Sequence, residues 1–178
     1  MERFTDYVQS RESCRQYDSS RPVEHEKLLR MVENARLAPS ACNSQPWHFT
    51  VINGGELARE TAKCLQDMGM NKFTDACPAF IIINEEKAKL SAIVGGRMKG
   101  QHYAGYDVGL AVAHLCFSAL EEGLSTCIIG WFNEEKLKAV AGIGKDKKIS
   151  LVLSVGYAVP GALRPKKRKE LSEIVTFL

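Results

Sequence analysis

Two arginines and a serine stand at alternate positions near the start of the chain. They are Arg11, Ser13 and Arg15, within the stretch RESCRQY. Alternate side chains of an extended segment point to the same side, so all three can face one ligand. Guanidinium groups donate paired, charge-assisted hydrogen bonds to phosphate, and a hydroxyl adds a neutral donor. The spacing therefore indicates a phosphate site, although two arginines near a terminus are more often simply solvated.

A second cluster of cations is the run RPKKRK at positions 164–169. The chain carries a net charge of +3 from 24 basic and 21 acidic residues, and without this run the remainder has a slight acidic excess. The positive charge is therefore one local feature, suited to phosphate or to nucleic acid. A basic tail alone gives only weak, salt-sensitive nucleic-acid binding, and no aromatic-rich platform or helix-turn-helix accompanies this one.

A third cluster concentrates amide and hydroxyl side chains between two prolines. It extends from Pro39 to Gln45, contains Ser40 and Asn43, and is followed closely by Trp47. Such groups can read the hydrogen-bonding edge of a heterocycle, and prolines fix the backbone so that the groups are pre-arranged. Taken singly, each of the three clusters is more often an ordinary turn or solvated surface.

Other chemical motifs are incomplete. The stretch AGIGKDKK contains the Gly-Lys pair of a phosphate-binding P-loop, but the chain has Ala139 and Asp146 where that motif needs Gly and Ser or Thr. GGRMKG lacks the glycine spacing of a dinucleotide-binding turn. The histidines lack metal-site spacing, so no metal is expected. Cys42 is a weak candidate nucleophile. The sequence does not place a histidine beside it, and a lone cysteine more often serves only as a small side chain.

Bulk composition indicates a single cytoplasmic domain. The 178 residues suffice for one domain, and 45% of them are hydrophobic. No segment approaches the apolar length of a membrane span, and the N-terminus MERFTDYVQSRES does not read as a signal peptide. The six cysteines include no C-x-x-C pair, which favours free thiols in a reducing cytoplasm.

Hydrophobic periodicity predicts alternating helices and strands, and hence a layered α/β or α+β domain with a sheet of about four strands. The expected helices are 4–9, 24–38, 57–68, 107–123 and 133–142, and the expected strands are 47–52, 79–84, 124–129 and 149–158. Residues 85–104 are expected to form a helix and then a loop. The helix 107–123 is apolar on nearly every face, which indicates covering by a second subunit. The apolar end of the chain, 171–178, is typical of an arm that packs on something.

The order of these blocks resembles that of the FMN-dependent nitroreductase family. R-x-S-x-R is followed by L-A-P-S-A-x-N-x-Q-P-W, then by DVGLAVAHLCFSALEEGLSTCIIGWF and LVLSVGYAVPGALRPKKRKELSEIV. The first motif alone is a weak signal, but the blocks in order are specific and cover nearly the whole chain. The resemblance implies an α+β fold, a three-layer α/β/α sandwich with a mainly antiparallel central sheet. It also implies one FMN-binding domain over 1–178 and a homodimer that exchanges C-terminal arms of about 164–178.

The resemblance assigns the phosphate side of the cofactor. Arg11, Ser13 and Arg15 match the family's phosphate motif, and Lys166 and Arg168 match the basic pair that closes on the same phosphate.

The ring side of the cofactor follows in the same way. Pro39, Ser40, Asn43 and Gln45 match the loop that flanks the isoalloxazine ring, with the Ser40 end usually given by the other subunit.

The backbone near flavin N5 corresponds to Ile129, Gly130 and Trp131. Many relatives have a Glu-Gly pair where this chain has Gly130-Trp131, so the shape over the ring differs while backbone donation can persist. Lys72 or Asn71 matches a residue that often touches the pyrimidine edge.

The activity implied is transfer of hydride from NADH or NADPH, through FMN, to an electron-poor acceptor such as a nitroaromatic or a quinone, in a ping-pong cycle. No catalytic side chain is expected beyond the flavin and the backbone near Gly130. The alternatives keep the flavin and change the reaction, to dehalogenation, flavin fragmentation or azoline oxidation. The short region 85–104 leaves little room for the extra lid common in the dehalogenating branch.

Overall fold

The computed structural model describes residues 3–161, 164 and 166–178. Its helices are α1 (Phe4–Ser10), α2 (His25–Arg36), α3 (Gly55–Leu65), α4 (Leu90–Lys99), α5 (Tyr103–Glu121) and α6 (Glu134–Ala141). Its strands are β1 (Trp47–Asn53), β2 (Ala79–Glu85), β3 (Ser125–Ile129) and β4 (Lys148–Gly156). Short 3-10 turns are η1 (Ala41–Asn43), η2 (Asp67–Gly69), η3 (Lys72–Ala76) and η4 (Leu171–Glu173). None of the described helices is long and apolar enough to cross a bilayer.

The four strands form one sheet in the order β1-β2-β4-β3, and every neighbouring pair is antiparallel. The apolar run AFIIIN forms β2, one of the two interior strands, where Ile81 pairs with Val51 on one side and Leu153 on the other. β3 lies at an edge of the sheet, which leaves one side of its backbone open to other segments. The α+β class and the mainly antiparallel sheet are confirmed.

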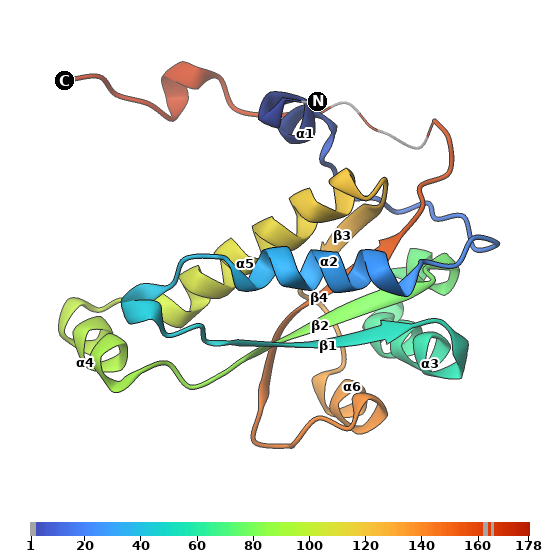
Figure 1. Ribbon diagram of the computed structural model, residues 1–178, viewed down its shortest axis with the longest axis horizontal. Helices are drawn as coiled ribbons and strands as arrows, with labels where there is room; N and C mark the ends of the chain where they lie inside the picture. The colour runs from blue at the N-terminus through green and yellow to red at the C-terminus, as the bar shows by residue number, and fades with distance from the viewer. Residues whose placement is uncertain (1–2, 162–163, 165) are drawn as a thin grey trace.

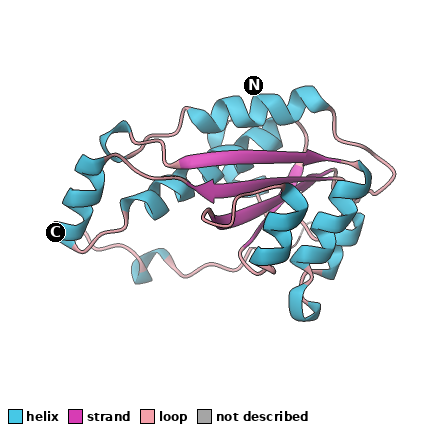
Figure 2. Cartoon of the chain, turned by 90° about the horizontal axis from the view of Figure 1, so that it is seen from below, coloured by secondary structure: helices cyan, strands magenta, loops and turns pink. Residues whose placement is uncertain are grey.

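Helices cover both faces of this sheet and give three layers (Figure 1 and Figure 2). Because side chains alternate along a strand, Ile81 and Ile83 pack in the cluster that includes α2 and α5. Phe80 and Ile82 pack in the opposite cluster, with α3 and α6. Both faces of β2 are therefore buried from solvent, which explains why its sequence is apolar without alternation.

The structure differs from the expected helix 57–68, because α3 ends at Leu65. Met68 (φ 53°) and Gly69 (φ 77°) are left-handed, and this stops the helical hydrogen-bond ladder. The region 85–104 does contain a helix, α4, which ends at the left-handed Gly100. The apolar helix α5 is buried on its sheet side, but Tyr106 and Leu110 are exposed on its other side.

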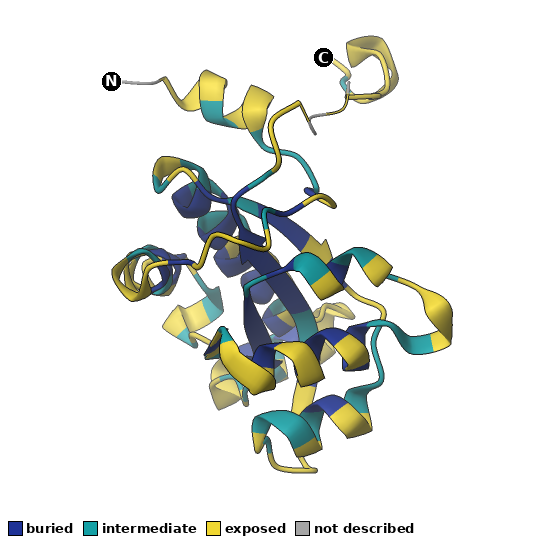
Figure 3. Cartoon of the chain, turned by 90° about the vertical axis from the view of Figure 1, so that its right-hand side faces the viewer, coloured by how far each residue is buried: buried dark blue, intermediate teal, exposed yellow. Residues whose placement is uncertain are grey.

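The end of the chain leaves the body of the protein. Residues 166–178 run past α1 and contain only the short turn η4 (Figure 1). Their apolar side chains at Leu171, Ile174 and Phe177 are exposed. Both terminal segments lie at the same end of the molecule and are mostly exposed (Figure 3).

Candidate functional site

The segment 11–15 is fixed at the start of the edge strand β3. The backbone N–H of Arg11 caps α1 by donating to Tyr7 O at 2.8 Å. Ser13 then forms a parallel bridge with Thr126, and Cys14 N donates to Thr126 O at 2.9 Å. The predicted extended conformation is therefore enforced by pairing with the sheet.

Tyr17 anchors the other end of this segment. Its ring is buried, and its hydroxyl lies 2.9 Å from Ser154 Oγ on the central sheet. A bridge to Ala158 and the bond from Val159 N to Gln16 O, at 3.0 Å, hold the backbone as well. Burial raises the pKa of Tyr17 well above its ordinary value, so this residue is a neutral structural anchor.

The segment 11–15 and the C-terminal run together line an open cavity of about 510 Å³. The residues that line it are Arg11, Glu12, Ser13, Arg15, Arg164, Lys166, Lys167 and Arg168. All five residues predicted for the phosphate side are thus brought together, from opposite ends of the chain. Six cationic side chains face one acidic side chain, so the cavity favours an anion.

Contacts along the chain explain how the C-terminal run reaches this cavity. Arg164 N donates to Glu12 Oε2 at 2.9 Å, and an Arg164 guanidinium nitrogen donates to Ser13 O at 3.1 Å. Lys166 Nζ donates to Gln9 O. Sequence reasoning did not single out Arg164, although it begins the run RPKKRK, because its partners lie far away in the sequence.

The turn η3 lies beside the cationic cavity. The guanidinium carbon of Arg15 is 5.9 Å from the centre of the Phe73 ring. Lys72, next to Phe73, is exposed. Asn71 precedes it with a left-handed backbone and donates through Nδ2 to Trp131 O at 3.1 Å. The segment 71–73 therefore connects the cavity with the residues that follow β3.

The predicted N5 segment lies at the far end of β3. Ile129 is buried, whereas Trp131 is 51% exposed, and its indole Nε1 donates to Asp67 O at 3.2 Å. Gly130 is four residues beyond Thr126, a span of about 13 Å along a strand. The edge strand thus joins the cationic cavity to the backbone at Gly130.

The polar loop lies elsewhere in the chain. It follows α2 and packs beside α4, at the opposite end of Figure 1 from the segment that joins α1 to α2. Asn43 and Gln45 are exposed, and Pro39 also faces solvent, while Ser40 is half-buried. One protomer therefore does not bring these four predicted residues to the cationic cavity.

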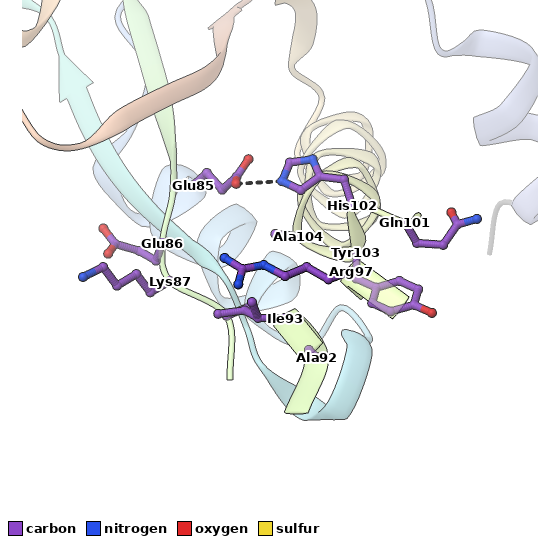
Figure 4. A pocket seen from close by; sticks show the side chains of 11 residues that line it. Glu85, Glu86, Lys87, Ala92, Ile93, Arg97, Gln101, His102, Tyr103 and Ala104 are labelled. Carbon is purple, nitrogen blue, oxygen red and sulfur yellow. Dashed lines mark hydrogen bonds and ion pairs between the residues drawn. The ribbon is translucent and has the colours of Figure 1, made fainter. Parts of the chain in front are cut away.

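Another cavity, of about 330 Å³, lies between the end of β2 and the helices α4 and α5 (Figure 4). His102 Nε2 is 2.9 Å from Glu85 Oε1 there, and Lys147 Nζ donates to Glu86 at 2.5 Å. None of the predicted site residues lines it. Among the described residues, no group of three or more His, Cys, Asp or Glu side chains is placed to hold a metal ion.

A family model described as the nitroreductase family matches residues 8–157. The chain belongs to the nitroreductase family. This match contains the R-x-S-x-R segment, the polar loop and the sheet, and it ends before the basic run. The family prediction is confirmed.

Two relatives of this nitroreductase and one solved structure span nearly the whole chain. A putative NAD(P)H nitroreductase YodC of Bacillus subtilis is 27% identical and covers 97% of this chain and 98% of its own length. Iodotyrosine deiodinase 1 of Rattus norvegicus is 25% identical over 97% of this chain, which matches 68% of that protein. A putative nitroreductase in complex with FMN from Exiguobacterium sibiricum shares the fold, with a TM-score of 0.82, 24% identity, and coverage of 100% of this chain and 98% of that one.

The donor set at the cationic cavity suits a phosphate monoester. Paired guanidinium groups, two lysines and a hydroxyl are the groups that bind such a dianion best. The single acid, Glu12, accepts the Arg164 backbone N–H, so its carboxylate is engaged by the main chain. Arg164 and Lys166 contribute positive charge from side chains that also bond to backbone oxygens of the N-terminal segment. The residues present therefore fit the phosphate end of a flavin mononucleotide.

Proposed function

We propose that this nitroreductase is an FMN-dependent oxidoreductase that passes hydride from NADH or NADPH to an electron-poor acceptor such as a nitroaromatic or a quinone. The observation that carries the proposal is the cationic cavity, which both ends of the chain build at the start of an edge strand. A phosphate with a charge of about −2 would be opposed there by several cations. The NAD(P)H nitroreductase relative supports nicotinamide as the hydride donor.

The phosphate would be held by Arg11, Ser13 and Arg15 from one end of the chain and by Lys166 and Arg168 from the other. Arg11 and Ser13 are half-buried, and the backbone at Ser13 is fixed by its bridge to the sheet, which reduces the ordering that phosphate binding requires.

The ring of the flavin would lie toward the other end of β3. The backbone of Ile129, Gly130 and Trp131 would approach N5, and Lys72 would approach the pyrimidine edge. Asn71 is an alternative for that edge, but its amide already donates to Leu65 O and Trp131 O, both at 3.1 Å. This leaves Lys72, which is exposed, as the better candidate.

The polar loop would come from a second copy of the chain, so that its Pro39, Ser40, Asn43 and Gln45 flank the ring bound by the first. Two features of the protomer support a homodimer. The outer side of α5 exposes Tyr106, 57% accessible, and the C-terminal segment exposes apolar side chains. Such surfaces are usually covered in an assembly. We infer a single domain over 1–178 whose arm, about 164–178, wraps the partner.

FMN, when bound, supplies a centre that accepts hydride from a nicotinamide and donates it to an acceptor. The chain would hold the cofactor, orient a backbone N–H near Gly130 and shape the cleft beside Trp131. No catalytic side chain is assigned. The six free cysteines agree with a reducing, cytoplasmic location.

Dehalogenation is the second candidate, because iodotyrosine deiodinase 1 is a relative. Flavin fragmentation and azoline oxidation are further reactions of the same fold, with no specific support here. Apart from the first two residues of α5, the ten-residue helix α4 is the helical structure in the region 85–104, and this short cover favours the reductase over an enzyme with a larger lid.

A nucleic-acid-binding function is disfavoured by the position of the basic run. Arg164 and Lys166 bond to the N-terminal segment, so the run is attached to the body of the protein at its start rather than extending freely.

The test begins with the colour and flavin content of the purified protein, followed by reconstitution with FMN. A yellow dimer that oxidises NADH or NADPH in the presence of nitroaromatics and quinones is expected. A colourless protein that does not take up FMN would reject the cofactor. A flavin-loaded protein that oxidises neither nicotinamide would reject the reductase, and release of iodide from iodotyrosine would favour the second candidate.

A further inference from the structure

The polar loop holds three non-glycine residues in left-handed backbone conformations. They are Cys42 (φ 53°), Asn43 (φ 49°) and Gln45 (φ 49°). This conformation is unfavourable for residues with a Cβ, because the Cβ approaches a carbonyl oxygen, although asparagine tolerates it better than most. Three such residues within four positions persist only where surrounding contacts hold them, and such strain is concentrated at ligand sites.

Hydrogen bonds inside the loop account for part of this restraint. Gln45 N donates to Ser40 Oγ at 2.9 Å, and Gln45 Nε2 donates to Asn43 Oδ1 at 2.9 Å. Ser44 Oγ donates to Ala41 O at 2.6 Å. These bonds fix the loop residues relative to one another, but they do not attach the loop to the body of the protein.

Asp107 on α5 makes that attachment. Both of its carboxylate oxygens lie 3.1 Å from Ala41 N, at the first residue of η1. Asp107 is only 5% exposed, and this N–H is the one hydrogen-bond donor to it within the described residues. Ionised carboxylates are rarely buried without a partner, so the pair is a specific contact. Within the described residues, the other bonds between this region and the body are those from Lys89 N to Ser44 Oγ, at 3.2 Å, and from Glu86 N to Pro46 O, at 3.0 Å, at the proline that ends the loop.

We infer that Asp107 is a positioning residue for the flavin. Its carboxylate fixes Ala41 N–H and thereby holds the left-handed loop that presents Ser40, Asn43 and Gln45 to the ring. The inference rests on the proposed function, and it adds a buried residue of α5 that does not itself touch the cofactor. Pre-arranging the loop removes the entropy loss that FMN binding would otherwise include.

The direct test compares Asp107→Ala with Asp107→Asn in the full-length protein. Asp107→Ala is expected to weaken FMN affinity about tenfold, measured by quenching of flavin fluorescence. Asp107→Asn keeps an oxygen that can accept from Ala41 N, so its affinity is expected to stay within about threefold of wild type. Equal affinity of wild type and a folded Asp107→Ala variant would overturn the inference.

Ser118→Ala is the matched control, because Ser118 lies on the same helix and is 4% exposed, and its hydroxyl has one hydrogen-bond partner among the described residues, Asn34 Nδ2 at 2.8 Å. It is expected to lower thermal stability without changing FMN affinity. If Ser118→Ala weakens FMN binding as much as Asp107→Ala does, the effect belongs to α5 as a whole, and the inference fails.

Removing the donor instead of the acceptor gives an independent variant in case Asp107→Ala does not fold. Ser40 is extended (φ −148°, ψ 151°), which is the conformation preferred before proline. The residue before the substitution is therefore compatible with Ala41→Pro, which removes the N–H that donates to Asp107, and the variant is expected to weaken FMN affinity to a similar degree. Affinity equal to that of wild type in this variant would contradict the inference.

A readout without cofactor separates this inference from the proposed function. Cys42 is exposed in the loop, and loosening the loop is expected to raise its rate of alkylation by iodoacetamide severalfold in flavin-free Asp107→Ala. An unchanged rate would overturn the inference even if FMN binding falls. If the wild type binds no FMN, the proposed function fails, while an accelerated rate still supports the anchoring of the loop.

Discussion

The backbone N–H of Arg164 donates to the carboxylate of Glu12 at 2.9 Å, although the two residues are 152 positions apart in sequence. This bond places the C-terminal run against the segment after α1 and closes the cationic cavity. Since each charge-assisted bond to a phosphate adds affinity, the cavity is where substitutions should weaken cofactor binding most directly.

Loss of one cation from this cavity should weaken FMN binding. We expect Arg11→Ala and Arg168→Ala each to raise the dissociation constant about tenfold or more, and added salt to reduce the difference from wild type. Equilibrium titration of flavin fluorescence measures both effects. Lys145→Ala, which removes an exposed cation outside this cavity, is the control. If both arginine variants retain FMN as tightly as wild type, the phosphate assignment is wrong.

Trp131 should affect the choice of acceptor more than the oxidation of nicotinamide. Its indole is half-exposed beside the segment assigned to N5, where it can offer aromatic surface to a planar acceptor. Trp131→Ala is expected to lower kcat/KM for nitroaromatics about tenfold and to leave turnover with ferricyanide within about threefold. Trp47→Phe, a conservative change at the protein's other tryptophan, should alter neither. Equal losses with both kinds of acceptor would contradict this role.

The cysteines should differ sharply in reactivity. Burial raises the pKa of the Cys77 thiol to about 12, and it raises the pKa of Cys116 and Cys127 as well, so few thiolates form at neutral pH. Cys42 is the exposed thiol. Iodoacetamide with mass spectrometry should therefore find one fast site per native chain, lost in Cys42→Ser and slowed by FMN. Fast alkylation of a second cysteine in the native protein would contradict the burial pattern.

Lowering the pH should remove the stabilisation that a hydrogen bond to Glu24 gives at the start of α2. The Tyr157 hydroxyl donates to Glu24 at 2.5 Å, and this bond lowers the pKa of the Glu24 carboxyl. A lowered folded-state pKa means that the stabilisation is present above the unfolded value, about 4.3, and is lost as pH falls through the folded value. Tyr157→Phe should therefore reduce the loss of unfolding free energy between pH 6 and pH 3, relative to wild type, in urea titrations.

Tyr103→Phe is the control for this pH experiment, since the Tyr103 hydroxyl has no hydrogen-bond partner in the described part of the chain. Its pH dependence should match that of wild type. A Tyr157→Phe profile parallel to wild type would show that Glu24 gains no stabilisation from this bond.

Much of the fold could be predicted from the hydrophobic pattern of short stretches of the sequence. The apolar run 79–84 predicted a buried strand, and the spacing from Leu28 to Ala35 predicted α2, because periodicity reports which side chains face a core. The wrong prediction that the helix continues to Met68 also has a local cause. Nothing in the periodicity of 57–68 marks the left-handed turn that ends α3 at Leu65.

The sequence by itself determined which kinds of groups the protein offers, namely guanidinium, ammonium, hydroxyl and amide donors in three clusters. Only the tertiary structure decided which of them meet. Arg164 reaches Glu12 across almost the whole chain, while the polar loop, nearer in sequence to Arg11, lies at the other end of the protomer and is bonded to Asp107. The reason is physical: spacing constrains neighbours within one helix or strand, whereas contacts between distant segments depend on how the layers pack around the sheet.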